Sequence, residues 1–429
     1  MTETVEQALA TLAALHPKKI DLGLERIERV LSKLGNPHLT LPPTVHVAGT
    51  NGKGSTLALL RAMCEAQGLN VHVYTSPHLV HFRERIVLAG QEISDDYLVD
   101  ILSRVRTANA GAPLSFFEAT TAAMFLAFSE TPADIALVEV GLGGRFDATN
   151  VITPALTAVT PVDYDHAEFL GRDLAGIARE KAGIFKPHTP AFIGVQNPTV
   201  RDVLESEAHR HGIEPAIQNQ DFRTHREHER LVFEDSHALL DLPLPALIGE
   251  HQIQNAGLAI ALARHMQITD RAIAQGLESA YWPARLQKLT HGPYAEAITK
   301  AGGELWLDGG HNPHAARAVA SVMAELEARH PRPLILITGI LSNKDIGGFL
   351  DAFEGLAQGI VGVSIKDHAA LAPETLRELA RTRGLEAHVA DTLTAAITQA
   401  LKLVEPDAHP PRILICGSLY LAGEVLGSR

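Results

Sequence analysis

The sequence has few cysteines, few aromatic residues and no long hydrophobic run. Its 429 residues include only 2 cysteines, Cys64 and Cys416, and 5% aromatic residues. Two cysteines so far apart, each in an apolar context, are typical of buried small side chains rather than of a disulfide or a metal site. No apolar stretch approaches the ~20 residues that a membrane-spanning helix needs. We therefore expect no disulfide framework, no membrane partner and a cytoplasmic location.

Positive charge is also scarce. The chain has 37 Lys and Arg residues against 50 Asp and Glu residues, which gives a formal net charge of -13 at pH 7. A surface of this sign repels the phosphate backbone of nucleic acids, so we expect no nucleic-acid partner. A local basic pocket for a small anion stays compatible with the composition. A hydrophobic content of 46% supports a sizeable core in two or three domains.

Short β-branched runs alternate with longer segments of helical periodicity along most of the chain. This alternation predicts parallel sheets with crossover helices. The segment "RTHREHERLVFEDSHALLDLPLPAL" breaks the alternation and predicts a small antiparallel excursion, and "AYWPARLQ" predicts a domain joint. We expect an α/β protein of two domains. Residues 1–284 would form a P-loop ATPase-type parallel sheet with helices on both faces, and residues 285–429 a smaller, Rossmann-like α/β domain.

A glycine-rich loop joins a predicted strand to a predicted helix in "VHVAGTNGKGST". Glycines let backbone N–H groups turn toward an anion, and the helix N-terminus adds partial positive charge. Lys53 would neutralise the outer phosphates, and we expect Ser55 or Thr56 to cap the helix. Gly54 separates Lys53 from Ser55, unlike in the common G-x-x-x-x-G-K-[ST] loop, which indicates another branch of phosphate-loop proteins. The predicted ATP-binding loop comprises Gly49, Thr50, Asn51, Gly52, Lys53, Gly54 and Ser55.

Polar residues follow three predicted strands where each strand ends. Glu139 ends one strand, Ser76 follows another in "VYTSPHL", and His166 follows a third in "VDYDHAEFLG". Ligand sites gather at the carboxyl ends of parallel strands, and ATP is handled as a magnesium complex that needs oxygen ligands. Taken singly, each residue has a simpler explanation, as a strand end, a helix cap or a loop histidine. Together, beside a phosphate loop, they predict a Mg²⁺ site.

Twelve motifs follow one another along nearly the whole chain. They are "HVAGTNGKGST", "TSPHL" with "FRERI" after it, "FFEATT", "VEVGLGGRFDATN", "DHAEFLG", "REKAGIFKP", "HQIQNA", "WPARLQ", "LDGGHNPH", "LSNKD" and "CGSLY". This series resembles the dihydrofolate synthase/folylpolyglutamate synthase family, a branch of the Mur-ligase-type ATP-dependent amide ligases. "IDLGLERI" near the start is similar to the bifunctional bacterial members, which also accept dihydropteroate.

The resemblance implies a role for each matching position. The magnesium positions are Ser76, Glu139 and His166; the nucleotide contacts include Asn255, Arg285 and Asp308; and the segments that hold the pteroate are Ser115, Phe116, Phe117 and Glu118 with Arg145, Phe146 and Asp147. Lys181 matches a lysine that the family carbamylates, the alternative being an unmodified lysine paired with a phosphate or carboxylate. The implied catalytic residues are Lys53, His166, Lys181, Arg285 and His311. Ala284 departs from the usual glycine before Arg285, and Gly310 departs from the usual alanine before His311.

The implied activity is the ATP-dependent joining of L-glutamate to dihydropteroate, and of further glutamates to folates by γ-linkage, through an acyl phosphate. The implied partners are these small molecules with ATP and Mg²⁺, and the implied state is a monomer. Two alternatives stay open, a Mur-type cell-wall amino-acid ligase and a P-loop regulatory ATPase. A regulatory ATPase would hydrolyse ATP with or without dihydropteroate and glutamate, and a cell-wall ligase would ignore the pteroate.

Overall fold

The computed structural model describes residues 3–15, 23–404 and 409–428 of the chain. By its internal contacts the chain divides into two compact units, Met1–Ala246 with Gln252–Tyr281, and Leu247–His251 with Trp282–Arg429. Residues 20–22 of the motif "IDLGLERI" lie outside the described residues. Each unit is an α/β structure built around a mainly parallel sheet, so the predicted fold class is confirmed.

The first unit contains, among the described residues, an eight-stranded sheet in the order β4-β3-β2-β5-β1-β6-β7-β8. Its strands are β1 (Thr44–Ala48), β2 (Val71–Tyr74), β3 (Ile86–Leu88), β4 (Gln91–Glu92), β5 (Ile135–Glu139), β6 (Leu156–Val159), β7 (Ala191–Ile193) and β8 (Ala216–Ile217). The pairs from β2 to β8 are parallel, whereas β3 and β4 add an antiparallel edge. The central strands β1, β5 and β6 are buried along their whole length, as expected of parallel strands covered on both faces.

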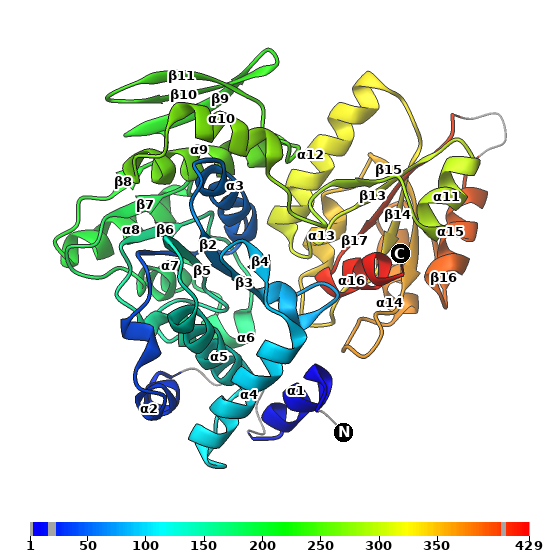
Figure 1. Ribbon diagram of the computed structural model, residues 1–429. Helices are drawn as coiled ribbons and strands as arrows, with labels where there is room; N and C mark the ends of the chain where they lie inside the picture. The colour runs from blue at the N-terminus through cyan, green and yellow to red at the C-terminus, as the bar shows by residue number, and fades with distance from the viewer. Residues whose placement is uncertain (1–2, 16–22, 405–408, 429) are drawn as a thin grey trace. The chain divides into compact units, whose positions relative to one another are not determined.

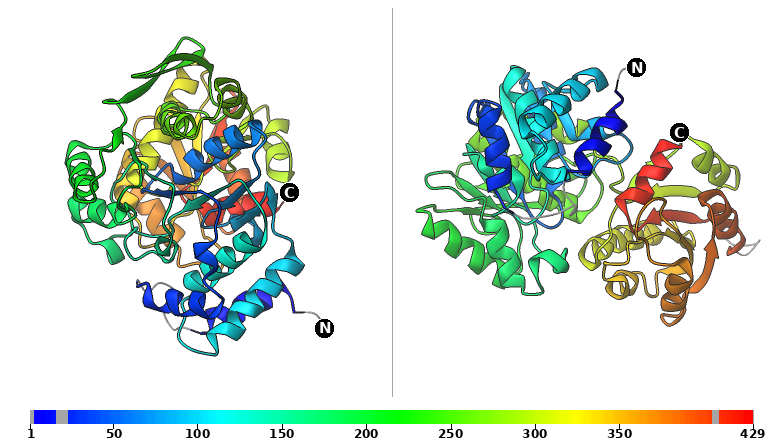
Figure 2. Two further views of the ribbon diagram at one scale, coloured as in Figure 1. Left: turned by 60° about the vertical axis from the view of Figure 1, so that its left-hand side comes forward. Right: turned by 90° about the horizontal axis from the view of Figure 1, so that it is seen from below.

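Helices cover both faces of this sheet (Figure 1). Its helices are α1 (Val5–Ala13), α2 (Glu25–Lys33), α3 (Lys53–Ala66), α4 (Asp95–Asn109), α5 (Phe116–Glu130), α6 (Ala167–Leu170), α7 (Leu174–Ala182), α8 (Pro198–Arg210), α9 (Glu250–His265) and α10 (Asp270–Ser279), with the 3₁₀ turns η1 (Pro37–Leu39), η2 (Phe82–Arg85) and η3 (Ala148–Val151). Figure 1 shows α3 and α10 on one face and α4 and α5 on the other. Figure 2 shows α1 and α2 outside α4 and α5, and these four helices share one apolar cluster.

The predicted antiparallel excursion is confirmed as a three-stranded sheet of β9 (Phe222–Glu227), β10 (Arg230–Asp235) and β11 (Leu239–Pro243). Buried and exposed residues alternate along β9, because one face packs inward and the other faces water. The Oγ1 of Thr224 lies 3.3 Å from the carbonyl oxygen of Ile253 in α9, which ties the small sheet to the first unit.

The second unit contains, in the described part of the chain, a six-stranded sheet in the order β12-β13-β17-β14-β15-β16. Its strands are β12 (Gln287–Leu289), β13 (Glu304–Leu307), β14 (Leu334–Thr338), β15 (Ala357–Val363), β16 (Glu386–Ala390) and β17 (Arg412–Cys416); its helices are α11 (Pro293–Lys300), α12 (Pro313–Arg329), α13 (Ile346–Asp351), α14 (Pro373–Arg381), α15 (Leu393–Lys402) and α16 (Leu419–Gly427). β12 pairs antiparallel with β13 and the other pairs are parallel. The sequence pattern missed β12, β8 and the β3–β4 edge, because these strands are only two or three residues long, and it also missed the five-residue β16.

Candidate active site

The glycine-rich loop leaves β1 and enters α3, as the sequence predicts. Gly49 and Gly52 have φ angles of 147° and 88°, in the region that favours glycine. A Cβ atom on Gly49 would lie 1.8 Å from Oγ1 of Thr160, and a Cβ atom on Gly52 would lie 2.5 Å from Oδ1 of Asn255. Both the backbone angles and the close neighbours therefore require glycine at these two positions.

The first turn of α3 has backbone N–H groups that no capping side chain covers. Gly52 is the N-cap and makes no side-chain cap hydrogen bond, so the expectation that Ser55 or Thr56 caps the helix is wrong. Ser55 is buried. Its Oγ accepts a hydrogen bond from Nε2 of Gln252 at 3.3 Å, so this hydroxyl is bonded to a side chain of α9 and not to the helix N-terminus. A helix N-terminus with uncapped N–H groups suits an anion such as a phosphate.

Lys53 folds back over the loop that precedes it. Its Nζ donates to the carbonyl oxygens of Gly49 at 3.1 Å and Thr50 at 3.3 Å, and it lies 3.8 Å from Oε1 of Glu139. The end of β6 supports the same loop, because Oγ1 of Thr50 donates to the carbonyl oxygen of Asp163 at 2.9 Å. The loop, the lysine and the carboxylate at the end of β5 are therefore neighbours.

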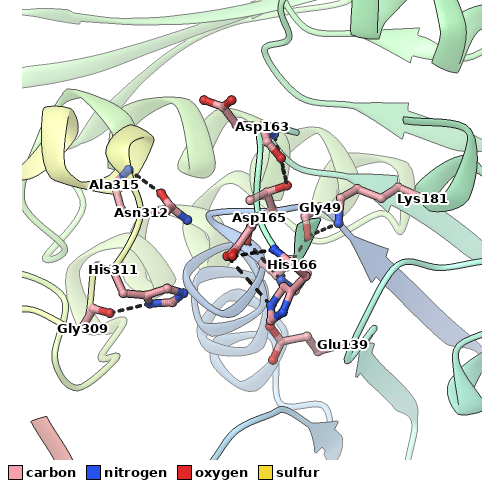
Figure 3. Close-up of polar contacts among 12 residues, drawn as sticks. Gly49, Glu139, Asp163, Asp165, His166, Lys181, Gly309, His311, Asn312 and Ala315 are labelled. Carbon is pink, nitrogen blue, oxygen red and sulfur yellow. Dashed lines mark hydrogen bonds and ion pairs between the residues drawn. The ribbon is translucent and has the colours of Figure 1, made fainter. Parts of the chain in front are cut away.

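The candidate magnesium residues lie at the end of β5 and in the loops after β2 and β6. The backbone N–H of Ser76 donates to Oε2 of Glu139 at 3.0 Å, which brings the ends of β2 and β5 together. His166 has a φ of 52°, and its backbone N–H donates to Oδ1 of Asp165 at 2.8 Å (Figure 3). In residues 3–15, 23–404 and 409–428 no three His, Cys, Asp or Glu side chains form a metal cluster. The carboxylate of Glu139 and the hydroxyl of Ser76 offer oxygen ligands of the kind that Mg²⁺ takes, and Mg²⁺ usually keeps several waters.

Lys181 is buried in α7 and reaches the same loop. Its Nζ donates to the carbonyl oxygen of Gly49 at 2.9 Å (Figure 3). Burial and the charge of Lys53 lower the pKa of Lys181 to about 7, against the opposing effect of Asp165 and Asp147. A substantial fraction of this amine is therefore neutral near pH 7, which makes it a nucleophile.

The segment Ser115–Glu118 begins α5 with a capping box. The Oγ of Ser115 accepts from the backbone N–H of Glu118 at 3.3 Å, and Oε2 of Glu118 accepts from the backbone N–H of Ser115 at 2.7 Å. Glu118 is buried and also accepts from Nε of Arg26 in α2 at 3.0 Å. Sequence reasoning missed Arg26, although it lies within "IDLGLERI". Phe116 and Phe117 are partly buried against the apolar cluster of α4 and α5.

Arg145, Phe146 and Asp147 lie in the loop between β5 and η3. Asp147 is buried and accepts from the backbone N–H groups of Leu142 at 2.8 Å and Thr149 at 3.0 Å, and burial raises its pKa. By contrast, Phe146 is 47% exposed, and Nε of Arg145 lies 3.8 Å from the carboxylate of Glu180. Within this predicted segment, Asp147 therefore organises the loop and Phe146 presents an apolar face to the surroundings.

In the second unit, Asp308 follows β13 and holds two turns together. Its carboxylate accepts from the backbone N–H groups of Leu286 at 2.8 Å and Gly310 at 2.7 Å. Burial raises the pKa of Asp308, and the nearby charge of Arg285 opposes this effect. Ala284 has a φ of 54°, a left-handed conformation that explains why glycine is the usual residue there.

Two histidines of the second unit lie near these charged groups, His311 near Asp308 and His251 near Arg285. Nδ1 of His311 lies 2.9 Å from the carbonyl oxygen of Gly309 and must donate to it (Figure 3). His251 is a residue that sequence reasoning missed, although it begins "HQIQNA". Burial, with the charges of His314 and Arg285, lowers the pKa of His251 to about 4, so its ring is neutral at pH 7.

The comparisons with known proteins cover nearly all of the chain. Residues 47–263 match the Mur ligase middle domain, and residues 295–419 match the Mur ligase glutamate ligase domain. The chain is 33% identical to the Escherichia coli protein named dihydrofolate synthase/folylpolyglutamate synthase, over 97% of this chain and 94% of that protein.

No described helix is long and apolar enough to cross a membrane.

Solved structures show the same likeness. The Escherichia coli FolC structure in complex with DHPP and ADP has a TM-score of 0.88 and 31% identity, and the match covers 99% of this chain and 97% of that one. A bifunctional folylpolyglutamate synthase/dihydrofolate synthase with Mn, AMPPNP and L-glutamate bound has a TM-score of 0.85 and 30% identity, with coverage of 100% and 98%. The chain belongs to the dihydrofolate synthase/folylpolyglutamate synthase family of Mur-type ATP-dependent ligases.

Proposed function

We propose that this protein joins L-glutamate to dihydropteroate and adds further glutamates to folates by γ-linkage, with ATP as the energy source. The observation that carries the proposal is the uncapped N-terminus of α3, with Lys53 lying 3.8 Å from the carboxylate of Glu139. This arrangement offers N–H groups and a cation to phosphates, and a carboxylate to a metal ion. Membership of the family supports the choice of substrates.

The reaction needs ATP because a free carboxylate has no good leaving group. The acceptor carboxylate attacks the γ-phosphorus of ATP, a C(O)O–P bond forms and ADP leaves. The amino group of L-glutamate then attacks the acyl carbon, the C–N bond forms, the bond to phosphate breaks and the amine proton passes to solvent. Negative charge gathers on phosphoryl oxygens in the first step, and the groups proposed to offset it are Lys53, Arg285 and His311.

The proposed nucleotide contacts are the loop Gly49–Ser55 with Asn255, Arg285 and Asp308. Asn255 is supported by its place beside the loop, because its Oδ1 lies 2.5 Å from where a Cβ atom of Gly52 would be. We assign nucleotide binding to residues 1–284. Residues 285–429 would supply Arg285, Asp308 and His311. The monomeric state and a cytoplasmic location stay part of this proposal.

Mg²⁺ is the proposed metal, held by Ser76, Glu139 and His166. When bound, it would neutralise phosphoryl oxygens. A relative holds Mn with AMPPNP, which supports a divalent ion beside the nucleotide. Carbamylation of Lys181 is supported by the lowered pKa of its amine, because only a neutral amine attacks CO₂. The product would be an anion in place of a cation next to the loop.

The proposed acceptor site is formed by Ser115–Glu118 and by Arg145–Asp147. The exposed ring of Phe146 offers an apolar face to a flat aromatic substrate, and the guanidinium of Arg145 offers a cation. The buried carboxylates of Glu118 and Asp147 accept hydrogen bonds from backbone N–H groups of these segments. We therefore propose that they fix the backbone conformation of the segments. The complex of a relative with DHPP supports a substrate of this kind.

A substrate panel tests the proposal. Dihydropteroate, tetrahydrofolate and its monoglutamate forms are each incubated with ATP, Mg²⁺ and L-glutamate, and ADP, phosphate and the glutamylated product are measured. We expect one ADP for each amide formed with dihydropteroate and with at least one folate. ATP hydrolysis that ignores the acceptor would favour a regulatory ATPase. Inactivity toward every pteroate would favour a cell-wall ligase.

A further inference from the structure

The loop of residues 75–85 lies at the edge of the sheet where the candidate active site is found. It follows β2, which pairs in parallel with β5, and β5 pairs in parallel with β1. The backbone N–H of Ser76 donates to the carboxylate of Glu139 at the end of β5. The carboxylate of Glu84 accepts from three backbone N–H groups of this loop, those of residues 79, 80 and 81, so the loop is ordered by its own contacts.

His78 is held on two sides within this loop. Nε of Arg85 lies 2.9 Å from Nδ1 of His78. The imidazole meets the ring of Phe82 nearly edge-on, with centroids 5.6 Å apart, and the Arg85 guanidinium lies over that ring. A guanidinium has no acceptor atom, so Nδ1 of His78 must accept this hydrogen bond. The ring is therefore neutral and carries its proton on Nε2.

The Nε2–H group of His78 is available to a ligand. His78 is only partly buried. Some buried side-chain nitrogen and oxygen atoms of the described residues have no hydrogen-bond partner, and Nε2 of His78 is not one of them. Among the described residues no side chain or backbone atom forms a hydrogen bond with this nitrogen, whereas Nδ1 has its partner in Arg85. The group is thus a donor of fixed position and fixed proton location.

Its neighbours place His78 between the two halves of the proposed active site. On one side, Ser76 is hydrogen-bonded to Glu139, which lies next to Lys53. On the other side, Phe82 meets Phe116 of the proposed pteroate segment edge-on, with centroids 6.1 Å apart. The carboxyl group that is phosphorylated and then joined to glutamate has to lie between the pteroate segment and the phosphates.

We propose that His78 is a catalytic residue that donates a hydrogen bond from Nε2 to an oxygen of the acceptor carboxyl group. This inference rests on the proposed function and adds a residue to it. As glutamate attacks the acyl phosphate, negative charge develops on the acyl oxygen, and a prepositioned N–H donor stabilises that charge. A neutral imidazole does this in other enzymes without giving up its proton. Arg85 is a positioning residue, because it fixes the proton of His78 on Nε2.

Three substitutions separate this role from a purely structural one. In His78→Gln the side-chain amide offers a donor near the position of Nε2. In His78→Asn the amide oxygen reaches the position of Nδ1, where it accepts from Arg85, but no donor lies at Nε2. His78→Phe keeps a ring without any donor. The exposed neighbour His81 provides the matched control His81→Asn.

We expect kcat with dihydropteroate to fall about 10²–10³-fold in His78→Asn and His78→Phe, with a much smaller loss in His78→Gln and none in His81→Asn. ADP affinity, measured by calorimetry, should be that of the wild type in all four variants, which shows that each is folded. Wild-type kcat in His78→Asn would overturn the proposal, and so would an equal loss in all three His78 variants. Failure of the proposed function would look different, because the wild-type enzyme itself would then be inactive toward dihydropteroate.

Discussion

The side-chain ammonium of Lys181 lies 2.9 Å from the backbone carbonyl oxygen of Gly49. One residue belongs to α7 and the other begins the phosphate loop, 132 positions earlier in the chain. The backbone carbonyls of Glu180 and Lys181 also lie within 3 Å of where a Cβ atom of Gly144 would be. The last turn of α7 therefore contacts both the glycine-rich loop and the loop that carries Arg145 and Phe146, so it links the proposed nucleotide side of the site to the proposed acceptor side.

Gly49→Ala tests the need for glycine at the start of the phosphate loop. The new Cβ atom would overlap Oγ1 of Thr160, so we expect the variant to unfold more readily than the wild type, by about 1–3 kcal/mol, and to bind ADP more weakly. Gly68→Ala is the control, because Gly68 also has a positive φ, of 88°, but no atom lies within 4 Å of the added Cβ. Urea denaturation measures the stability of the two variants. An equal loss of stability in the two variants would contradict a steric cause at Gly49.

Lys53→Ala tests the phosphate loop directly. Removal of the cation that we propose to lie next to the transferred phosphoryl group should lower kcat for glutamate addition about 10²–10³-fold and leave the fold intact. Circular dichroism checks the fold, and coupled release of ADP and phosphate measures the rate. Lys33→Ala, at an exposed position in α2, should behave as the wild type. Turnover retained in Lys53→Ala would remove the basis for the ATP site.

The pKa of about 7 predicts a pH-dependent modification of Lys181. Below this pH the amine is protonated and cannot attack CO₂, whereas above it the neutral form dominates. At a fixed concentration of dissolved ¹³CO₂, the carbamate signal in ¹³C NMR should therefore grow as the pH rises through about 7. Lys181→Met should lack the signal. A signal of the same size in Lys181→Met would place the carbamate elsewhere, and no signal in the wild type would favour an unmodified lysine.

Arg285→Ala should impair chemistry more than ATP binding. Its guanidinium lies near the buried carboxylate of Asp308, and its Nη1 donates to the carbonyl oxygen of Ala284 at 2.9 Å, so the cation is held in place before substrate arrives. We expect kcat to fall about 10²-fold and ATP affinity to change far less. Arg329→Ala, at the exposed end of α12, is the control. Equal losses in kcat and in affinity would make Arg285 a binding residue only.

Glu304 should stabilise the second unit only at pH values at which its carboxyl group is ionised. Burial alone would raise the pKa of Glu304, but hydrogen bonds from Lys288 and Trp306 and the charges of Lys288 and Arg412 lower it from 4.5 to about 2. A carboxylate with a lowered pKa contributes its full stabilisation above about pH 4.5 and loses it as the pH falls toward about 2. The difference in unfolding free energy between wild type and Glu304→Gln should shrink over this range.

Tryptophan fluorescence during urea denaturation measures this difference. Both tryptophans, Trp282 and Trp306, belong to the second unit, so the signal reports its unfolding. Lys300→Gln, an exposed substitution at the end of α11, is the matched control and should show no such pH dependence. A wild-type advantage that stays constant from about pH 5 to about pH 2 would contradict the lowered pKa of Glu304.

Much of the site could be predicted from local patterns. The spacing of glycines, lysine and hydroxyls after a buried strand indicated the phosphate loop, and the positive φ angles of Gly49 and Gly52 give the reason. Likewise, Glu139 was expected at a strand end, where the parallel register now places it opposite Val47 of β1. Short edge strands were missed because two or three residues carry too little periodicity. The cap of α3 was assigned wrongly, because the sequence does not tell which of several small residues has the non-helical backbone of an N-cap.

By itself, the sequence determined the alternation of strands and helices, the loop that needs glycine and the side chains available for catalysis, because each depends on residues within a few positions of one another. Only the tertiary structure decided which of those side chains meet. Arg26 with Glu118 is an example of two residues 92 positions apart, and the contact of Lys181 with Gly49 is another. Such pairs form when distant helices pack on a shared sheet, and that packing also removes water from Lys181 and so lowers the pKa of its amine.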